Sequence, residues 1–364
     1  NFEIYKTDDF SGNVTSISVK EIQRDNVPRI DYTGGGCPHI LSEPQRTNEI
    51  TYSEDFSDSS WTKTGSVSVS SNSVISPDGT LNGSTITGLT GSGSNDLRFG
   101  TSINPASTTY TSSVYLKGSG TIRIQMSNNV DNAGSETITL SSSWVRYDLT
   151  HTFNATTGSL ALTLDDSGGT ATTYDIWGAQ LEAGSYATSY IPTSGSTVTR
   201  NQDVFTREGI SSLINSTEGT FFAEISKPID TVDAYQLISL NNNAANSDRN
   251  SVTIGFMLNT NKLFIRVKSS GSNVFQSSNQ VSNADTFYKV AISYKSGASK
   301  IYVDGSSITP NSGNISGTFT FDAILDKLSF DYNGNNGLPF YGNVRQLQVY
   351  KTALTDAQLQ DLTT

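Results

Sequence analysis

Residues 121–127 read TIRIQMS, and this stretch decides the fold class of the chain. Its apolar side chains, Ile122, Ile124 and Met126, alternate with the polar residues Arg123 and Gln125. Successive side chains of a β-strand point to opposite faces, so a period of two predicts a strand with one buried and one polar face. We therefore expect a half-buried sheet.

The same alternation recurs on both sides of this stretch. It is present in SVYLKG (113–118), WVRYDLTHTF (144–153) and SLALTLDD (159–166), which are separated by turns rich in Gly, Ser and Asn. In the second of these, the period predicts that Val145, Tyr147 and Leu149 point inward and that Trp144, Arg146 and Asp148 point outward. Residues 47–192 are therefore predicted to form one β-sandwich.

A second alternating series follows from residue 207 to the C-terminus. It comprises GTFFAEISKP (219–228), YQLISL (235–240), VTIGFMLNTNKLFIRVK (252–268), FYKVAISYKSGASKIYVDG (287–305) and KLSFDY (327–332). Asn259–Lys262 predicts a hairpin turn, and Asp304-Gly305 predicts a tight one. We expect a second β-sandwich over 207–364.

The chain ends in a predicted short helix, over Leu354–Leu362. Thr355 is a suitable N-cap, and Ala357 and Leu359 are expected to face the sandwich. Residues 1–46 are expected to form a connector with short strands, and residues 193–206, rich in Ser and Thr, a linker. The predicted fold class is thus all-β, with two tandem antiparallel β-sandwich (jelly-roll) domains.

Composition limits the classes of partner. The chain has 364 residues, enough for two domains, with 23 basic and 34 acidic side chains and a net charge of −11. A negative chain without a basic run repels DNA and anionic membranes, so neither nucleic acid nor membrane insertion is expected.

The single cysteine excludes an intramolecular disulfide, and we expect neither a signal peptide nor a transmembrane segment. Because the chain begins without Met, it is expected to be part of a longer or processed protein.

The segment Val27–Trp61, VPRIDYTGGGCPHILSEPQRTNEITYSEDFSDSSW, resembles a run found in tail, spike and fibre proteins of bacteriophages and prophages. This resemblance implies a virion structural protein that reaches the extracellular medium by lysis of the host. It also implies contacts with other virion proteins and a homo-oligomer, commonly a trimer.

Two further resemblances concern the domains. ITYSEDFSDSSWTKTG (50–65), YTSSVYLKGSGTIRIQ (110–125), SSSWVRYDLTHTFNAT (141–156) and YDIWGAQLEAGSYATSYIP (174–192) make the first domain similar to carbohydrate-binding-module jelly rolls. FYKVAISYKSGASKIYVDG and FYGNVRQLQVYKTALTDAQLQDLTT (340–364) make the second similar to laminin-G-like or concanavalin-A-like lectin domains. Arg345 stands where many laminin-G-like domains carry an aspartate, as is common in phage versions.

Calcium is the one cofactor that the sequence suggests, and none is required. In the first domain the resemblance implies ligands at Glu54 and Asp55, although Trp177 and Gly178 stand where the family has an Asp pair. In the second, Asp331 opens DYNGNNG (331–337), which lacks the Gly and Glu of an EF-hand loop, so an exposed turn is the competing interpretation. Asp304 and Asp331 are the calcium candidates there.

Six residues on predicted outer faces form a candidate carbohydrate site: Arg98, Tyr115, Arg123, Gln125, Trp144 and Arg146. Aromatic rings stack on the CH groups of a pyranose, and polar side chains bind its hydroxyls. The alternative is a solvated face on which the Trp packs against a neighbouring subunit or domain. Trp61 and Trp177 are instead predicted to lie in the core.

Catalytic signatures are weak. Asp165-Asp166 and Glu54-Asp55 are adjacent pairs that point to opposite faces of a strand, whereas a glycosidase brings two carboxylates together. His39 and His151 lack metal-ligand spacing, and Cys37 is interpreted as a turn residue.

The expected function is therefore non-enzymatic adhesion to a host-surface or environmental polysaccharide. A purely structural virion protein and a polysaccharide-degrading enzyme are the alternatives.

Overall fold

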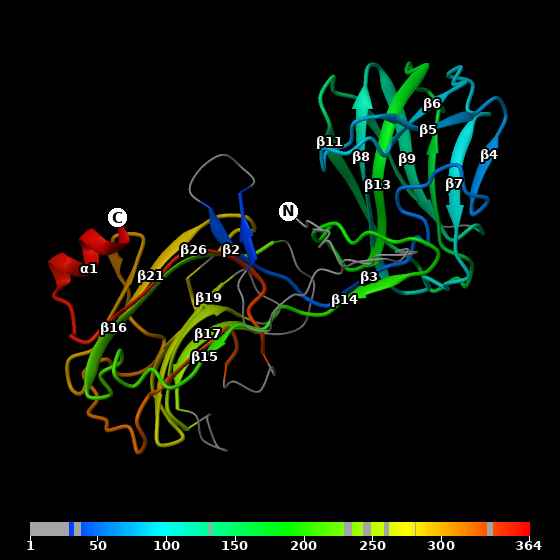
Figure 1. Cartoon of the computed structure of the whole chain (residues 1–364). Coiled ribbons are helices and arrows are strands. Elements are labelled where there is room, and N and C mark those ends of the chain that lie inside the picture. The colour runs from blue at the N-terminus through cyan, green and yellow to red at the C-terminus, as the bar shows by residue number, and fades with distance from the viewer. Residues whose placement is uncertain are drawn as a thin grey trace, which may run out of the picture.

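The computed structural model describes residues 29–32, 38–130, 133–228, 235–242, 249–257, 262–280, 282–332 and 338–364. Its strands pair in antiparallel order and build two β-sandwiches, one from each half of the chain (Figure 1). The predicted all-β class is confirmed. Cys37 and residues 333–337 lie outside the described residues, as does most of the predicted Asn259–Lys262 turn.

The first sandwich packs two five-stranded sheets against each other. One has the order β10-β9-β12-β7-β4 and consists of β4 (Trp61–Thr64), β7 (Asp96–Gly100), β9 (Thr121–Ser127), β10 (Ala133–Thr139) and β12 (Ala161–Asp165). The other has the order β11-β8-β13-β6-β5 and consists of β5 (Ser68–Val74), β6 (Gly83–Thr87), β8 (Thr109–Gly118), β11 (Val145–Thr152) and β13 (Thr173–Ala183).

The alternation of β9 buries its apolar face as predicted: Ile122, Ile124 and Met126 are at most 1% exposed. Trp61, also predicted as a core residue, is 1% exposed. The prediction for Val145 is wrong, because this side chain is 37% exposed. Val145 pairs with the buried Leu116 but opens the edge strand β11, where burial begins only further along the strand.

The second sandwich packs two seven-stranded sheets. One has the order β1-β2-β26-β16-β21-β22-β23, with β1 (Arg29–Asp31), β2 (His39–Ser42), β16 (Glu218–Ser226), β21 (Tyr288–Lys295), β22 (Lys300–Val303), β23 (Ser306–Ser307) and β26 (Gly342–Tyr350). The other has the order β15-β25-β17-β18-β19-β20-β24, with β15 (Thr206–Arg207), β17 (Gln236–Asn241), β18 (Ser251–Phe256), β19 (Leu263–Ser269), β20 (Ser272–Ser277), β24 (Ser312–Gly313) and β25 (Lys327–Ser329).

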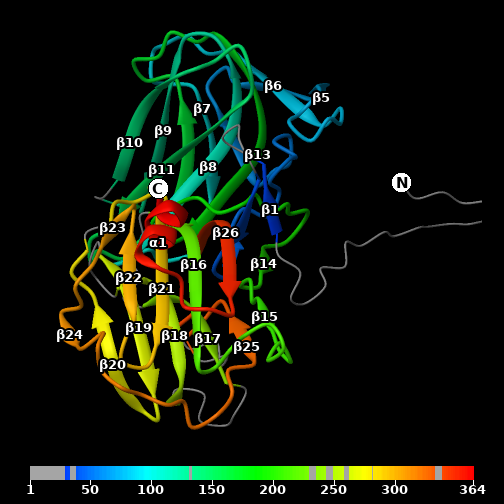
Figure 2. The ribbon, with the colours of Figure 1, turned by 90° about the vertical axis from the view of Figure 1, so that its left-hand side faces the viewer.

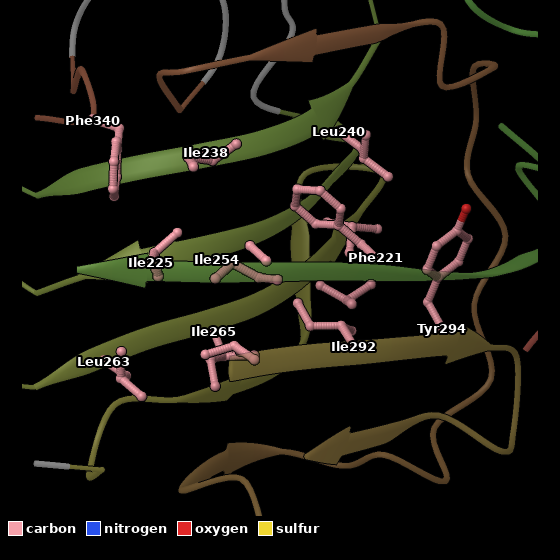
Figure 3. Close-up of a cluster of buried hydrophobic side chains, with 14 of the residues drawn as sticks. Phe221, Ile225, Ile238, Leu240, Ile254, Leu263, Ile265, Ile292, Tyr294 and Phe340 are labelled. Atoms are coloured by element: carbon pink, nitrogen blue, oxygen red, sulfur yellow. The ribbon is translucent and has the colours of Figure 1, made fainter. Parts of the chain in front are cut away.

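Its core lies between these sheets (Figure 3). Phe221 of β16 and Ile292 of β21 meet Ile238, Ile254 and Ile265 from the facing sheet, and all five are fully buried. Burial of such side chains stabilises the fold by about 1.5–3 kcal/mol each. This core is separate from that of the first sandwich.

The turns of the second sandwich follow the sequence signals. Strands β18 and β19 are antiparallel neighbours, as the hairpin prediction requires. Asp304 and Gly305 have φ values of 45° and 75° between β22 and β23. Positive φ at both central residues is the geometry of a type I′ turn, which Asp-Gly favours.

The α-helix α1 (Asp356–Thr363) covers the outer face of the sheet that contains β21 and β22 (Figures 1 and 2). Thr355 caps it in a capping box, as predicted. Leu359 is fully buried against Phe222 and Tyr302, whereas Ala357 is exposed and its predicted inward position is wrong. Among the described residues no helix has the length and apolar content needed to cross a membrane.

The segment before the first sandwich contains short strands, as expected, and the expected linker after it contains one strand as well. Strand β2 pairs with β26 and therefore belongs to the second sandwich. Strand β3 (Arg46–Asn48) pairs with β14 (Val198–Arg200), which lies within the expected linker. The two chain segments that join the sandwiches thus run side by side as a two-stranded sheet (Figure 1).

Candidate functional site

The six candidate carbohydrate-binding residues lie on two opposite outer faces of the first sandwich. Arg98 of β7 and Arg123 and Gln125 of β9 belong to one sheet. Tyr115 of β8 and Arg146 of β11 belong to the other. Trp144 precedes β11 on this second sheet. The structure therefore does not bring all six into one site.

The face that carries Arg98 is polar and already internally paired. Arg98 donates a hydrogen bond to Asn129, and Arg123 Nε lies 3.0 Å from an Asp165 carboxylate oxygen. One row across the five strands reads Thr62, Arg98, Thr163, Gln125 and Ser135. The outward residues that the structure describes on these strands include no aromatic ring. This face favours the solvated alternative.

Tyr115 and Arg146 instead line a cleft of about 650 Å³ between the two sandwiches. Its first wall is the outer face of the β8 sheet together with the loop that follows β13. Its second wall is the end of the second sandwich that holds β1, β2 and the start of β26. The lining residues are Arg29, Ile30, Asp31, Leu41, Ser42, Glu43, Tyr115, Arg146, Tyr186, Ala187, Thr188, Ser189, Tyr190, Pro228, Gly342 and Asn343.

An aromatic stack supports the first wall. Trp177 lies between Tyr115 and Tyr190, with ring centroids 5.3 and 4.8 Å away. Trp177 is buried as predicted, at 6% exposed, but it packs against Tyr115 and Tyr190 and does not belong to the hydrophobic cluster between the sheets. The cause is a bulge after Trp177, where Gly178 has a φ of 62° and shifts the register. The period of two therefore does not continue from Ala179 back to Trp177.

Arg146 projects into the cleft from β11. Its Nη1 donates to Thr188 O at 2.7 Å, its Nη2 donates to Ser113 Oγ at 2.8 Å, and the guanidinium carbon lies 5.6 Å from the centroid of the Tyr115 ring. No described carboxylate lies within ion-pairing distance of it. Arg146 is therefore a positive group held in place by neutral acceptors.

Tyr190 is a half-buried hydrogen-bond donor on the same wall as Arg146. Its hydroxyl lies 2.6 Å from Ser53 Oγ and donates to Glu54 Oε1 at 3.0 Å. Burial, reinforced by the Glu54 charge, raises the pKa of Tyr190 above its usual value. The phenol is consequently protonated across the physiological range.

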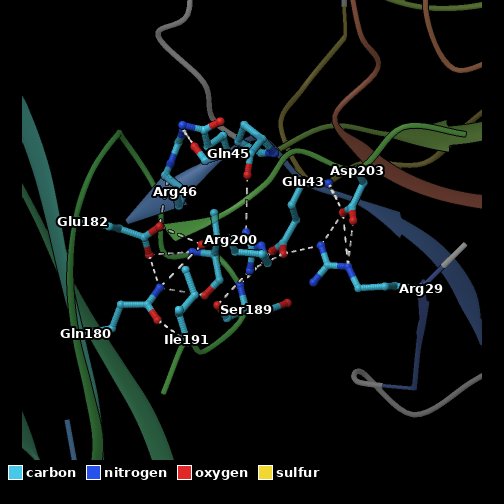
Figure 4. Close-up of polar contacts among 12 residues, drawn as sticks. Arg29, Glu43, Gln45, Arg46, Gln180, Glu182, Ser189, Ile191, Arg200 and Asp203 are labelled. Carbon is cyan, nitrogen blue, oxygen red and sulfur yellow. Dashed lines mark hydrogen bonds and ion pairs between the residues drawn. The ribbon is translucent and has the colours of Figure 1, made fainter. Parts of the chain in front are cut away.

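A network of charged residues lies at the junction of the sandwiches (Figure 4), and two of its members, Arg29 and Glu43, line the cleft. Glu43 Oε2 lies 2.6 Å from Arg29 Nη2 and 3.0 Å from Arg200 Nη1, and Arg29 also pairs with Asp203. Glu43 Oε1 accepts a hydrogen bond from the backbone N–H of Ser189 at 2.8 Å. Burial lowers the pKa of Arg29, but the adjacent Asp203 and Glu43 outweigh it, and the net shift is upward.

Trp144 lies outside this cleft. Its Nε1 donates to Ile75 O at 2.9 Å, and Lys117 Nζ lies 5.8 Å from the centroid of its ring. Ile75, which accepts this hydrogen bond, and Val145, which follows Trp144 in the chain, are 60% and 37% exposed. Trp144 is thus part of a partly apolar surface, which suits the alternative of packing against a neighbour.

The predicted calcium residues have other partners. Glu54 accepts hydrogen bonds from Tyr190 and Asn82, Asp55 accepts from Ser57, and Asp304 Oδ1 accepts from Lys289 N. Asp331 is 2% exposed, and its main-chain oxygen accepts from Ser239. In the described part of the chain, His, Cys, Asp and Glu side chains form no group of three or more that could hold a metal ion. Calcium binding stays a prediction.

Several cleft residues were not predicted. Tyr186 and Tyr190 follow the last strand of the first sandwich, where alternation no longer applies, and Arg29 comes from the segment expected to be a connector. The closely spaced tyrosines of SYATSYIP (185–192) were the available signal. His39 and His151 lie in β2 and β11 and contact Phe287 and Phe153 by their ring edges.

Residues 212–360 match a family model described as the concanavalin A-like lectin/glucanases superfamily. The predicted similarity of the second domain to such lectins is confirmed. Among curated proteins no significant match is found.

Solved structures show weaker similarity. The CBM40 of the Ruminococcus gnavus IT-sialidase bound to α2,6-sialyllactose has 15% identity and a TM-score of 0.35, over 44% of this chain and 98% of its own. Domain 4 of the Geobacillus stearothermophilus arabinanase AbnA in complex with arabinotriose has 18% identity and a TM-score of 0.32, over 50% of this chain and 81% of its own. The enzymatically active domain of tailspike protein 4 of bacteriophage CBA120 has 12% identity and a TM-score of 0.29, over 37% of this chain and 21% of its own. All three TM-scores are below 0.5, and none establishes what this chain binds.

Proposed function

We propose that this protein is a non-enzymatic glycan-binding protein whose saccharide ligand lies in the cleft between the two sandwiches. The observation that carries the proposal is the set of three tyrosines and one arginine, Tyr115, Tyr186, Tyr190 and Arg146, around one cleft. The volume of about 650 Å³ is within the range of small-ligand sites. Tyrosine rings provide faces for a pyranose, and the guanidinium provides donors for its oxygens.

The second sandwich contributes to the same site. Leu41, Ser42, Gly342 and Asn343 line the cleft from that side, and residues 212–360 are similar in sequence to a lectin and glucanase superfamily. A cleft built from two domains is a common location for a ligand site. We therefore assign binding to the intact pair of sandwiches.

The biological setting of this proposal is a virion. The resemblance of residues 27–61 to phage tail, spike and fibre proteins supports it. A fibre or spike that presents several copies, as in a trimer, would convert weak binding by each cleft into strong adhesion to a host-surface polysaccharide.

A glycan array tests the binding function. The intact protein is applied in calcium and in chelator, next to Tyr186→Ala and the control Trp144→Ala, which changes an aromatic residue outside the cleft. We expect wild type and Trp144→Ala to bind the same glycans and Tyr186→Ala to bind them about tenfold more weakly, since loss of a stacking ring costs roughly 1 kcal/mol or more. Unchanged binding by Tyr186→Ala would contradict the cleft as the site.

A structural role is the second candidate, favoured by the partly apolar surface at Trp144. Sedimentation of Trp144→Ala tests it: loss of assembly with intact glycan binding supports subunit packing there.

Catalysis is tested separately. The carboxylates lining the cleft are Asp31, whose Oδ2 lies 3.5 Å from His39 Nε2, and Glu43, which is paired with two arginines. We expect no release of reducing ends from capsular or algal polysaccharides, and their appearance would contradict the non-enzymatic assignment.

A further inference from the structure

The charged residues of the cleft differ in how well they are neutralised. Arg29 and Glu43 pair with each other and, through Asp203 and Arg200, form a group of two positive and two negative side chains. Within the described residues this group leaves no net charge at the junction. It therefore contributes little to attracting a charged ligand.

Two charged cleft residues lie outside this group: Asp31, whose carboxylate lies 3.5 Å from His39 Nε2, and Arg146, the one positive side chain among the described lining residues that has no carboxylate partner. A guanidinium has five N–H donors, of which one on Nη1 is donated to Thr188 O and one on Nη2 to Ser113 Oγ. Its Nε is buried and has no hydrogen-bond partner among the described residues. Three N–H groups and one full positive charge are thus not matched by protein groups that the structure describes.

Such a charge is costly to hold in a partly desolvated cleft. A buried charge is normally paired, and an arginine fork binds a carboxylate or sulfate through two parallel hydrogen bonds. Thr188 and Ser113 fix the guanidinium without neutralising it, and the ring of Tyr115 lies against it. The site is therefore preorganised for an anion that comes with the ligand.

We propose that the cleft selects an anionic saccharide and that Arg146 binds the carboxylate or sulfate of one sugar residue. This inference rests on the proposed glycan-binding function and adds the chemical class of the ligand. In this cleft Arg146 determines the specificity for an anionic group, while the tyrosines bind the sugar ring.

Matched pairs of probes test the class. Trigalacturonic acid is compared with its methyl ester, and a sulfated galactan oligosaccharide with its desulfated form, by calorimetry at low and at physiological salt. We expect at least one acidic member to bind about tenfold or more tightly than its neutral partner, because a charge-assisted hydrogen bond is roughly twice as strong as a neutral one. The pair that shows the preference identifies carboxylate or sulfate as the group recognised.

Variants assign the preference to the residue. Arg146→Met should bind acidic and neutral members equally, and Arg146→Lys, which keeps the charge but lacks the fork, should retain only part of the preference. Arg207→Met, at an exposed arginine outside the cleft, removes the same charge and should behave as wild type. If Arg146→Met does not fold, Arg146→Lys still tests the inference. Wild-type selectivity of Arg146→Lys for the acidic probes would overturn the role of the guanidinium fork.

The outcomes separate this inference from the proposed function. Equal binding of both members of every pair by the wild type would overturn the selection of anions and leave glycan binding intact. Binding of neutral glycans on the array, with none of the acidic probes bound, would also overturn the selection of anions and leave glycan binding intact. Failure to bind any saccharide would overturn both.

Discussion

Asp166 illustrates how one residue organises a loop. Its carboxylate is fully buried and accepts hydrogen bonds from the backbone N–H groups of Thr90, Gly91 and Gly93 at 2.8–2.9 Å and from Asn95 Nδ2 at 2.8 Å. Burial would raise the pKa of Asp166, but these donors outweigh it and hold the pKa far below its usual value. The loop is thus held by a charged acceptor.

Asp166→Asn should lower the free energy of unfolding by about 2–3 kcal/mol at neutral pH, because an amide presents a donor to several N–H groups and loses the charge. A depressed folded pKa contributes stability above the ordinary carboxyl value of about 4 and loses it as the pH falls toward the folded value. The difference in the free energy of unfolding between Asp166→Asn and wild type should therefore become smaller in acid. Denaturant unfolding at several pH values measures it, with the exposed Asp148→Asn as control. Equal stability of Asp166→Asn and wild type at pH 7 would show that the Asp166 carboxylate does not stabilise this loop.

The neighbouring carboxylate shows what sequence can and cannot predict at this scale. Adjacent acids in a strand point to opposite faces, and Asp165 indeed pairs with Arg123 on the outer face while Asp166 binds the loop. The pattern does not reveal that Thr90–Asn95 would donate to Asp166, because those residues lie more than seventy positions away. Hydrogen bonds between residues so far apart in the sequence can be identified only from the three-dimensional structure.

At the scale of elements, alternation predicts strands well until a bulge interrupts it. Ile122, Ile124 and Met126 follow the period of two along the whole of β9. In β13 the extra residue at Gly178 reverses the faces, so that Trp177 lies on the outer face of the sheet, where it is buried against Tyr115 and Tyr190. A glycine in a strand is a signal for a bulge, and here it also determines the aromatic wall of the cleft.

Gly178→Ala tests that bulge. A side chain at positive φ costs about 1–2 kcal/mol, and the added Cβ would also approach Tyr115 and Tyr190 to 3.3 and 3.4 Å. Gly79→Ala is the matched control, because Gly79 has a φ of 86° and open space around its Cβ position. We expect thermal unfolding of Gly178→Ala at a lower temperature than that of Gly79→Ala, with altered tryptophan fluorescence. The same loss in both variants would mean that the tyrosines do not constrain the bulge.

The C-terminal helix is stabilised chiefly by one side chain. Leu359→Ala removes a fully buried group that packs on Phe222, Ala291 and Tyr302 and should cost about 2–4 kcal/mol. Gln360→Ala, on the exposed side of the same helix, should cost little. Chemical denaturation compares the two. If both variants match wild type, the helix does not contribute to the second sandwich.

At the scale of the whole molecule, the two sandwiches meet through residues that sequence analysis assigns to a connector and a linker. Arg29 contacts Asp203 across 174 positions, and β3 pairs with β14. Local patterns predict each sandwich because their strands obey a period of two, whereas a junction of single charged side chains has no period. The predicted all-β fold is therefore confirmed. The cleft could not be predicted from local patterns, because it forms only where the two domains meet.

Glu43 is the residue on which this junction depends. It is 5% exposed, pairs with Arg29 and Arg200, and holds the N–H of Ser189 in the loop that carries Tyr186 and Tyr190. Removing one member of a buried ion pair leaves the partner charges uncompensated, at a cost of about 3–5 kcal/mol. The junction thus links the packing of the domains to the shape of the cleft.

Glu43→Ala should consequently separate the unfolding of the two sandwiches into distinct calorimetric transitions and speed proteolysis between residues 193 and 206. It should also weaken glycan binding, because the loop of Tyr186 and Tyr190 loses its anchor. Glu218→Ala is the control, since its ion pair with Lys295 is on the surface, and surface pairs contribute little. A single transition and wild-type binding in Glu43→Ala would show that the cleft forms without the charged network.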